Sequence, residues 1–331
     1  MRSTLLRLVV LAACCAPLTT GHGLLLSADG AFVTLNDGHA MPRINLGTCC
    51  GSQPSVGVVP WLAAGGVGID TAVSYKDSPD IAAGLATAGV DRSKLFITTK
   101  IMAGNGDAPH DCAADPDVAL LAVKGALVDL NTSYLDLVLM HRPCQQSGLV
   151  CEWRYPTRTQ VCNQTAPPRF PGPADPAAAN GKLWQGLIAA QKQGLVRSIG
   201  VSNFGAAEIA ALPSVVPAVN QIEHSPMGWD ASTVASCLAA GIVVEAYSTL
   251  KGCPFDADVV KSPAATYNKT AAQVCLRWAV QRAGALASGT GSDDKTVRQY
   301  TEENLDIFDF KLTDAEMLAL DTYQAGHSLT N

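Results

Sequence analysis

The sequence has no run of basic residues, and its formal charge at pH 7 is −6. A chain of this charge is not expected to take nucleic acid or an anionic membrane surface as its main partner. It also has no repeated block, which excludes an array of structural repeats. With 331 residues, of which 48% are hydrophobic and 16% charged, the chain is long enough to bury the core of one large domain.

Long apolar runs are missing as well, apart from a short one at the N-terminus. Arg2 and Arg7 precede LVVLAACCAPL, which Pro17 interrupts before it reaches the length of a membrane span. Residues 1–21 are therefore interpreted as a signal peptide and residues 22–331 as the folded domain. The competing interpretation is an uncleaved interfacial anchor. We expect the secretory pathway or the extracellular space, or a plastid reached by a signal-led route, with no membrane contact after cleavage.

Cysteine, in contrast, is abundant. Two of the 11 cysteines, Cys14 and Cys15, lie in the signal segment. The mature chain keeps Cys49, Cys50, Cys112, Cys144, Cys151, Cys162, Cys237, Cys253 and Cys275. Because their number is odd, at least one thiol is free or paired between chains. Asn-X-Ser/Thr sequons at Asn131, Asn163 and Asn268 become candidate glycosylation sites in a secreted chain and should then be exposed.

Strand-like and helix-like segments alternate along most of the chain. The segment AFVTLNDGHAMPRINLG predicts a hairpin around Asp37-Gly38, and then a strand. Strands are predicted over residues 43–46, 68–70, 95–99, 135–141, 198–202, 218–223, 242–246 and 285–288. Helices are predicted over residues 58–64, 81–88, 118–130, 182–194, 206–211, 232–240, 270–282, 296–307 and 313–322. Eight alternations with nearly continuous apolar strands predict an α/β fold with a parallel, fully covered sheet.

Four polar residues stand at or just beyond the ends of apolar runs: Asp70, Tyr75, Lys100 and His141. In a barrel of alternating strands and helices, the strand ends converge on one rim, where chemistry takes place. A neighbouring ammonium favours the phenolate and lowers the pKa of a tyrosine, while a carboxylate holds that ammonium in place. Taken singly, these residues have plainer roles, as a helix N-cap, a buried ring, a surface charge and a core histidine. Together they predict a proton-donor site.

Two irregular segments interrupt the alternation on the same rim. Residues 144–180 follow the strand that leads to His141, and residues 103–117 follow Lys100. A long irregular loop inside a compact domain is usually functional or disordered. We expect residues 144–180 to form a disulfide-stapled cover, while Cys237 and Cys275, on apolar helix patterns, stay reduced and buried. The expected bridge joins two of Cys112, Cys144, Cys151 and Cys162.

Seven motifs follow one another along the chain: GIDTAVSY, FITTK, YLDLVLMHRP, GLVRSIGVSNF, VNQIEHSP, VVEAYSTL and EENLDIFDFKLT. In this order and spacing they resemble the aldo-keto reductase family over roughly residues 31–323. The resemblance implies an eight-stranded parallel (β/α)8 barrel of the TIM type with an N-terminal β-hairpin across its bottom. It also implies that Tyr75 donates a proton, Lys100 tunes Tyr75, Asp70 anchors Lys100, and His141 orients the substrate carbonyl.

By the same resemblance, a second group of residues binds a nicotinamide cofactor. Ser202, Asn203 and Gln221 match the positions that hydrogen-bond the nicotinamide carboxamide, and Tyr247 matches the ring that stacks on the nicotinamide. The flat nicotinamide ring can stack on an aromatic side chain, and its amide can pair with hydrogen-bond donors and acceptors. The residues matched to the adenine and phosphate end are Glu303 and Asn304, with Lys295 and Arg298 as nearby cations. No metal site is predicted.

Some positions depart from the family pattern. Ser225 replaces a usual His, and Tyr300 replaces the usual Arg four residues before Asn304. Lys295 and Arg298 can replace the missing positive charge, whereas Asp293 and Asp294 oppose a phosphate. NADP is therefore the predicted cofactor, and NAD remains the other candidate. Cys49 stands where the family often has an aromatic residue, so Cys49 and His141 should line a substrate pocket that is roomier or redox-sensitive. The pair Cys49-Cys50 is interpreted as two small buried hydrophobic side chains rather than a reactive pair.

These observations predict an NAD(P)-dependent oxidoreductase that reduces an aldehyde or ketone by hydride transfer. Its partner would be a small-molecule carbonyl compound. The alternatives are a non-catalytic redox-cofactor-binding or regulatory protein on the same barrel, and a structural glycoprotein that keeps only the barrel. Cofactor binding separates the last of these from the first two, and turnover separates the enzyme from the binding protein.

Overall fold

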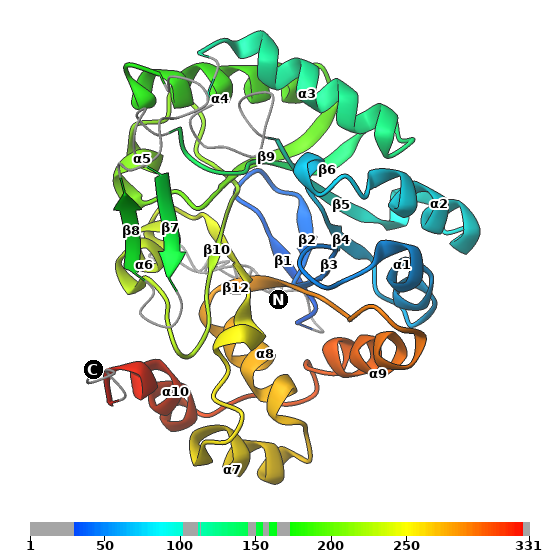
Figure 1. Cartoon of the computed structure of the whole chain (residues 1–331), viewed down its shortest axis with the longest axis vertical. Coiled ribbons are helices and arrows are strands. Elements are labelled where there is room, and N and C mark those ends of the chain that lie inside the picture. The colour runs from blue at the N-terminus through cyan, green and yellow to red at the C-terminus, as the bar shows by residue number, and fades with distance from the viewer. Residues whose placement is uncertain are drawn as a thin grey trace, which may run out of the picture.

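The computed structural model describes residues 30–101, 112, 114–144, 150–154, 159–163 and 173–326, and the predicted signal segment lies outside them. Eight parallel strands form its centre: Ile44–Gly47 (β3), Gly68–Asp70 (β4), Phe96–Ile101 (β5), Leu135–Met140 (β6), Val196–Ser202 (β9), Val219–Glu223 (β10), Val243–Tyr247 (β11) and Gly284–Ser288 (β12). They close into a barrel in the order β10-β11-β12-β3-β4-β5-β6-β9, which Figure 1 shows end-on. The predicted eight-stranded parallel barrel is confirmed.

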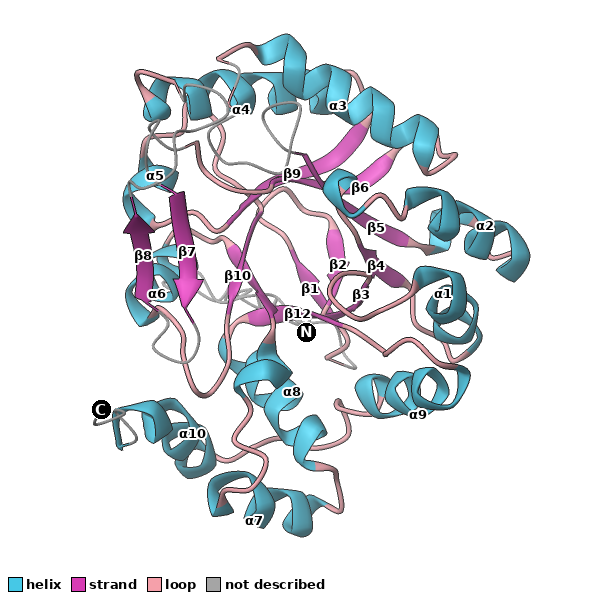
Figure 2. Ribbon diagram, in the orientation of Figure 1, coloured by secondary structure: helices cyan, strands magenta, loops and turns pink. Residues whose placement is uncertain are grey.

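Helices surround the barrel, as Figure 2 shows. Their bounds are Pro54–Ala63 (α1), Ser78–Ala88 (α2), Pro116–Asp129 (α3), Pro176–Lys192 (α4), Ala206–Ala210 (α5), Ala231–Ala239 (α6), Asp258–Tyr267 (α7), Ala271–Arg282 (α8), Asp294–Leu305 (α9) and Asp314–Gly326 (α10). Asp115, Asp175, Asp230 and Asp293 cap four of these helices by accepting backbone N–H groups, and Thr270 and Gln273 form a capping box at α8. Within the described ranges, no helix is long and apolar enough to cross a membrane.

A hairpin closes the N-terminal end of the barrel. Strands β1 (Phe32–Thr34) and β2 (Ala40–Pro42) pair antiparallel, with Val33 opposite Met41. Gly38, in the predicted turn, has φ +92°, a conformation that glycine adopts without steric cost. Val33 and Met41 are buried in one cluster with Phe96 and Val219, the first residues of β5 and β10. Because the hairpin covers the N-terminal end, a site is expected at the opposite, C-terminal rim of the barrel.

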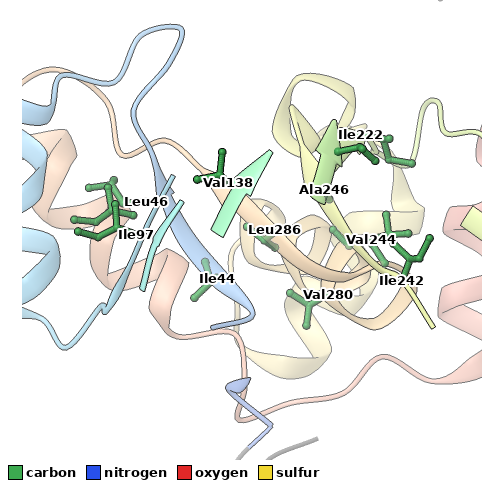
Figure 3. Close-up of a cluster of buried hydrophobic side chains, with 14 of the residues drawn as sticks. Ile44, Leu46, Ile97, Val138, Ile222, Ile242, Val244, Ala246, Val280 and Leu286 are labelled. Carbon is green, nitrogen blue, oxygen red and sulfur yellow. The ribbon is translucent and has the colours of Figure 1, made fainter. Parts of the chain in front are cut away.

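Successive residues of each strand alternate between the outside and the inside of the barrel. Ile222, Val244 and Ala246 belong to the apolar cluster between strands and helices that Figure 3 shows. Val219 and Val243, on the alternate positions, belong instead to the cluster with the hairpin. Two residues further along each strand the same inward alternation reaches Gln221 and Glu245. The inward side chains therefore change from apolar near the hairpin to polar nearer the rim.

Two strands and one α-helix are not predicted from the sequence. Within residues 144–180, predicted as irregular, Val150–Arg154 (β7) and Thr159–Asn163 (β8) pair antiparallel, and their register places Cys151 opposite Cys162. Helix α4 also begins inside that range, at Pro176. The prediction of an irregular segment is wrong for these parts, and the rest of the expected cover lies outside the described residues. Helix α7 was not predicted, because Pro263 lies inside it and proline usually ends a helix.

The cysteines form three disulfides within the described ranges. Cys112 is bonded to Cys144, so the expected bridge within the four-cysteine set is found. Cys253 is bonded to Cys275, and the prediction that Cys275 stays reduced is wrong. The reason is that the start of α8 packs against the 3-10 helix Thr249–Gly252 (η3), which Cys253 follows. Cys237 is free and buried, as predicted.

Cys49 and Cys50 are bonded to each other directly after β3. Cys50 is exposed and has φ +62°, because the chain turns sharply there. The interpretation of this pair as two buried hydrophobic side chains is therefore wrong. Of the sequons, Asn131 and Asn268 are exposed, just after α3 and α7 respectively, and Asn163 ends β8.

Candidate active site

The four predicted site residues lie together at the C-terminal rim. Asp70 ends β4, Lys100 is next to last in β5, Tyr75 ends the 3-10 helix Val73–Tyr75 (η1), and His141 follows β6. Lys100 Nζ donates to Asp70 Oδ1 at 2.6 Å and to Tyr75 Oη at 3.4 Å. The rings of Tyr75 and His141 meet edge to face with centroids 5.8 Å apart. A carboxylate, an ammonium, a phenol and an imidazole thus form one contiguous group.

Burial is the largest single influence on the pKa values of Lys100, Tyr75 and His141. It opposes the charge on Lys100, but Asp70, Tyr75 and Glu245 together outweigh it and raise the pKa of the ammonium, which stays charged. Burial also raises the pKa of Tyr75 above its ordinary value, against the opposing effect of Lys100. The expectation of a net lowering at Tyr75 is therefore wrong, although Lys100 acts in the expected direction. Tyr75 holds its proton at neutral pH, which is the form that an acid requires.

His141 is a neutral imidazole. Burial, followed by the charges of Lys100 and Arg142, lowers its pKa to about 3. Its Nδ1 atom is buried and has no hydrogen-bond partner in the described part of the chain. A neutral imidazole carries one N–H donor and one acceptor nitrogen. His141 can therefore donate a hydrogen bond to a carbonyl oxygen beside Tyr75 without adding a charge.

A network of hydrogen bonds continues from Asp70 across the inside of the barrel. Gln221 Nε2 donates to Asp70 Oδ2 at 2.8 Å and to Glu245 Oε2 at 2.7 Å. Asn45 Nδ2 donates to Glu245 Oε1 at 2.9 Å. Strands β10 and β4 lie four positions apart in the barrel order, so the bond from Gln221 to Asp70 spans the lumen. Burial, and then the charge of Asp70, raise the pKa of Glu245 to about 8.

Glu245 and Asn45 were not predicted from the sequence as site residues. The signal that would have found them is the period of two: Glu245 stands two residues before Tyr247 in VVEAY, and Asn45 interrupts the apolar strand INLG. Both are fully buried. A carboxylate inside an otherwise apolar strand needs polar partners, and for Glu245 the barrel interior supplies them as Gln221 and Asn45.

The residues matched to the nicotinamide end also come together. Tyr247 Oη donates to Asn203 Oδ1 at 2.6 Å, and Asn203 Nδ2 donates to the His141 carbonyl and to Ser202 Oγ, both at 3.0 Å. Ser202 Oγ donates to the Gln221 carbonyl at 2.8 Å. Asn203 has φ +62°, a left-handed conformation that asparagine tolerates better than most residues. These hydrogen bonds connect the C-terminal ends of β9, β10 and β11 in one polar network.

A cavity of about 1020 Å³ joins these groups to the opposite side of the rim. Its lining includes Asp70, Tyr75, His141, Ser202, Asn203, Gln221, Tyr247, Glu303 and Asn304. Thr270 Oγ1 donates to Glu303 Oε2 at 3.2 Å, and Asn304 Nδ2 donates to the Gly289 carbonyl at 3.3 Å. Lys295 and Arg298 are exposed on α9, and neither is among the described residues that line the cavity.

The Cys49–Cys50 disulfide lines this cavity and a second one. The second cavity, of about 450 Å³, is also lined by Tyr75, Asp77 and Asp80. Tyr75 and the two cysteines belong to both linings. Cys49 therefore lines the same two cavities as Tyr75, and it is the residue predicted from the sequence to line the substrate pocket.

Comparisons with known proteins agree with this geometry. A sequence model of the Aldo/keto reductase family matches residues 58–325. An aldo-keto reductase of Mycolicibacterium vanbaalenii is 33% identical over 300 residues, which cover 89% of this chain and 92% of that protein. The NADP-dependent D-sorbitol-6-phosphate dehydrogenase of Malus domestica is 31% identical over 308 residues, which cover 86% and 91% of the two chains.

The solved structures similar to this fold include a Bombyx mori aldo-keto reductase in complex with NADP. It superposes with a TM-score of 0.70 at 30% sequence identity. The match covers 91% of this chain and 94% of the Bombyx mori chain. Both sequence and fold thus match one family over nearly the whole described barrel.

Proposed function

The chain belongs to the aldo/keto reductase family, and on that premise we propose that it is an NADP-dependent reductase of aldehydes or ketones with Tyr75 as the proton donor. One observation carries the proposal: Lys100 is only 1% exposed, and its Nζ contacts both Asp70 and Tyr75, which line the large cavity. A charged group buried to this degree needs partners. Here Asp70 holds the ammonium in place, and Tyr75 is the proposed acid.

The donor set of the cavity suits NADP. At one end, Asn203 and Gln221 offer amide groups and Tyr247 an aromatic ring; at the other, Thr270, Glu303 and Asn304 offer polar groups. Lys295 and Arg298 are the cations on α9 proposed for the 2′-phosphate. When bound, NADPH supplies the hydride that reduces the carbonyl carbon. The Bombyx mori relative binds NADP, which supports the choice of cofactor.

The chain's own residues supply the rest of the chemistry. Tyr75 donates its proton to the oxygen of the carbonyl group as negative charge develops there. His141 donates an N–H to the same oxygen and so orients it. Lys100 stabilises the phenolate that remains on Tyr75, and Asp70 holds Lys100 in place. The small-molecule substrate is expected to lie against Cys49 and His141.

Fluorescence titration of the mature protein with NADPH and with NADH tests the proposed cofactor, and a turnover assay on small aldehydes and ketones tests the reaction. We expect NADPH to bind, to bind more tightly than NADH, and to be oxidised when a carbonyl compound is added. Binding without turnover would favour the non-catalytic binding protein instead. Failure to bind either cofactor would refute the proposal.

The predicted signal peptide leads us to propose that this reductase enters the secretory pathway and carries glycans. Oxidised cysteines and exposed sequons support it, since disulfides persist mainly in oxidising compartments. Non-reducing peptide mapping of protein from a secreting eukaryotic host should recover Cys112–Cys144 and Cys253–Cys275, with Cys237 as a free thiol. Glycans are expected on Asn131 and Asn268, and Asn163 is the third candidate. A full set of free thiols and bare sequons would contradict the secretory route.

A further inference from the structure

The side-chain amide of Gln221 is held at two points. Its Nε2 carries two hydrogens, and one is directed to Asp70 Oδ2 at 2.8 Å and the other to Glu245 Oε2 at 2.7 Å. Asp70 is ion-paired with Lys100 and can only accept, which fixes the nitrogen of Gln221 on that side. The carbonyl Oε1 is then the atom of this amide that remains to receive a donor from a ligand in the cavity.

Glu245 itself is held from the opposite side of the barrel. Asn45, on β3, donates to Glu245 Oε1 at 2.9 Å and also contacts the carbonyls of Pro42 and Leu286. Glu245 and Asn45 are both 0% exposed. Space for Asn45 depends on the absence of a side chain at Gly68, whose Cβ would overlap the Asn45 amide oxygen. The pair is therefore a built part of the interior rather than two side chains left there by chance.

We propose that Glu245, supported by Asn45, is a positioning residue for the nicotinamide end of the cofactor. It holds the Gln221 amide in the orientation that presents Oε1 to the donor hydrogens of the cofactor carboxamide. This inference rests on the proposed function. A single bond to Asp70 would leave the amide free to rotate about that contact, whereas two bonds define its plane.

The arrangement also connects cofactor placement to the proton donor. Gln221 shares Asp70 with Lys100, and Lys100 contacts Tyr75. The acceptor at Glu245 Oε2 is available whether or not the carboxyl carries a proton, because a carboxylic acid oxygen keeps lone pairs. Glu245 makes no hydrogen bond to Lys100 or Tyr75 in the described part of the chain. Its hydrogen bonds reach the site through Gln221, and its charge acts on Lys100 through space.

Two ligands that differ only in the nicotinamide separate positioning from general damage. They are NADPH and 2′-phospho-ADP-ribose, which keeps the adenine, phosphates and riboses but lacks the ring and its amide. In Glu245→Leu, the dissociation constant for NADPH should rise about tenfold, the effect of one lost hydrogen bond to a charged or strongly polar group. The dissociation constant for 2′-phospho-ADP-ribose should change less than about twofold. Glu245→Gln keeps one carbonyl acceptor, so its dissociation constant for NADPH should lie between those of the parent and of Glu245→Leu.

Asp136→Asn is the matched control. Asp136 is also a buried carboxylate, but it accepts from Arg92 and Arg197 near the N-terminal end of β6, far from the cofactor residues. Its variant should lower thermal stability without changing the ratio of the two dissociation constants. If Glu245→Leu fails to fold, Glu245→Gln carries the test, and an unchanged ratio in Glu245→Gln overturns the inference.

The outcomes distinguish a failure of the positioning role of Glu245 from a failure of the proposed function. A parent that binds NADPH, with a Glu245→Leu variant that loses both ligands equally or neither, would overturn the positioning role alone. A parent that binds 2′-phospho-ADP-ribose and NADPH with equal affinity would also overturn it, because the nicotinamide would then make no productive contact. A parent that binds neither ligand would overturn the proposed function and this inference with it.

Discussion

Replacing Tyr75 with Phe should reduce carbonyl turnover at least about 100-fold and leave NADPH affinity nearly unchanged. The phenol is the proton donor beside the carbonyl, and loss of a general acid costs a rate factor of about this size. The ring remains, so its packing against His141 and the lining of the cavity persist. Steady-state kinetics together with fluorescence titration of NADPH measure the two quantities separately.

Tyr134→Phe is the matched control for this prediction. The Tyr134 hydroxyl donates to the Arg92 carbonyl at 3.2 Å, at the end of the barrel opposite the rim. Losing that hydroxyl removes one hydrogen bond and no chemistry, so turnover should stay close to the parent value. Near-normal turnover in Tyr75→Phe would instead remove Tyr75 from the role of proton donor.

The barrel was predictable from sequence because its signals are local. Runs such as LFITTK and YLDLVLMH are buried on both faces, and each ends in a polar residue that the parallel arrangement brings to a common rim. The capping box at Thr270 and the turn at Gly38 are equally local, and both occur where the sequence places them. For the same reason the grouping of Asp70, Lys100 and His141 follows once the alternation of strands and helices is recognised.

What the sequence did not predict depends on contacts across the barrel or between distant segments. Glu245 and Asn45 are 200 positions apart, and they meet only because β11 and β3 flank β12. Cys275 has the apolar helical pattern of a buried thiol, and only the packing of η3 on α8 brings it to Cys253. The net shift at Tyr75 was also missed, since the amount of burial that opposes Lys100 is a property of the assembled site.

Replacing Lys100 with Met should lower turnover at neutral pH about 100-fold and move the pH dependence of alcohol oxidation to higher pH. The cation lowers the pKa of Tyr75, so the pKa rises further when the cation is removed. Oxidation needs the phenolate as the base, and its rate therefore increases only at a higher pH than in the parent. Reduction uses the protonated phenol, which the variant keeps, but the phenolate it must form is no longer stabilised.

The same substitution leaves Asp70 without its ammonium partner. Asp70 is 4% exposed, and breaking a buried ion pair from one side costs about 3–5 kcal/mol of the free energy of unfolding. Lys124→Met, at an exposed position of α3, is the matched control and should change neither stability nor the pH profile. If the oxidation profile of Lys100→Met coincided with that of the parent, Lys100 would not tune Tyr75. The contact at 3.4 Å would then be structural, and the acid strength of Tyr75 would be set by burial and by the nearby carboxylates of Asp70 and Asp77.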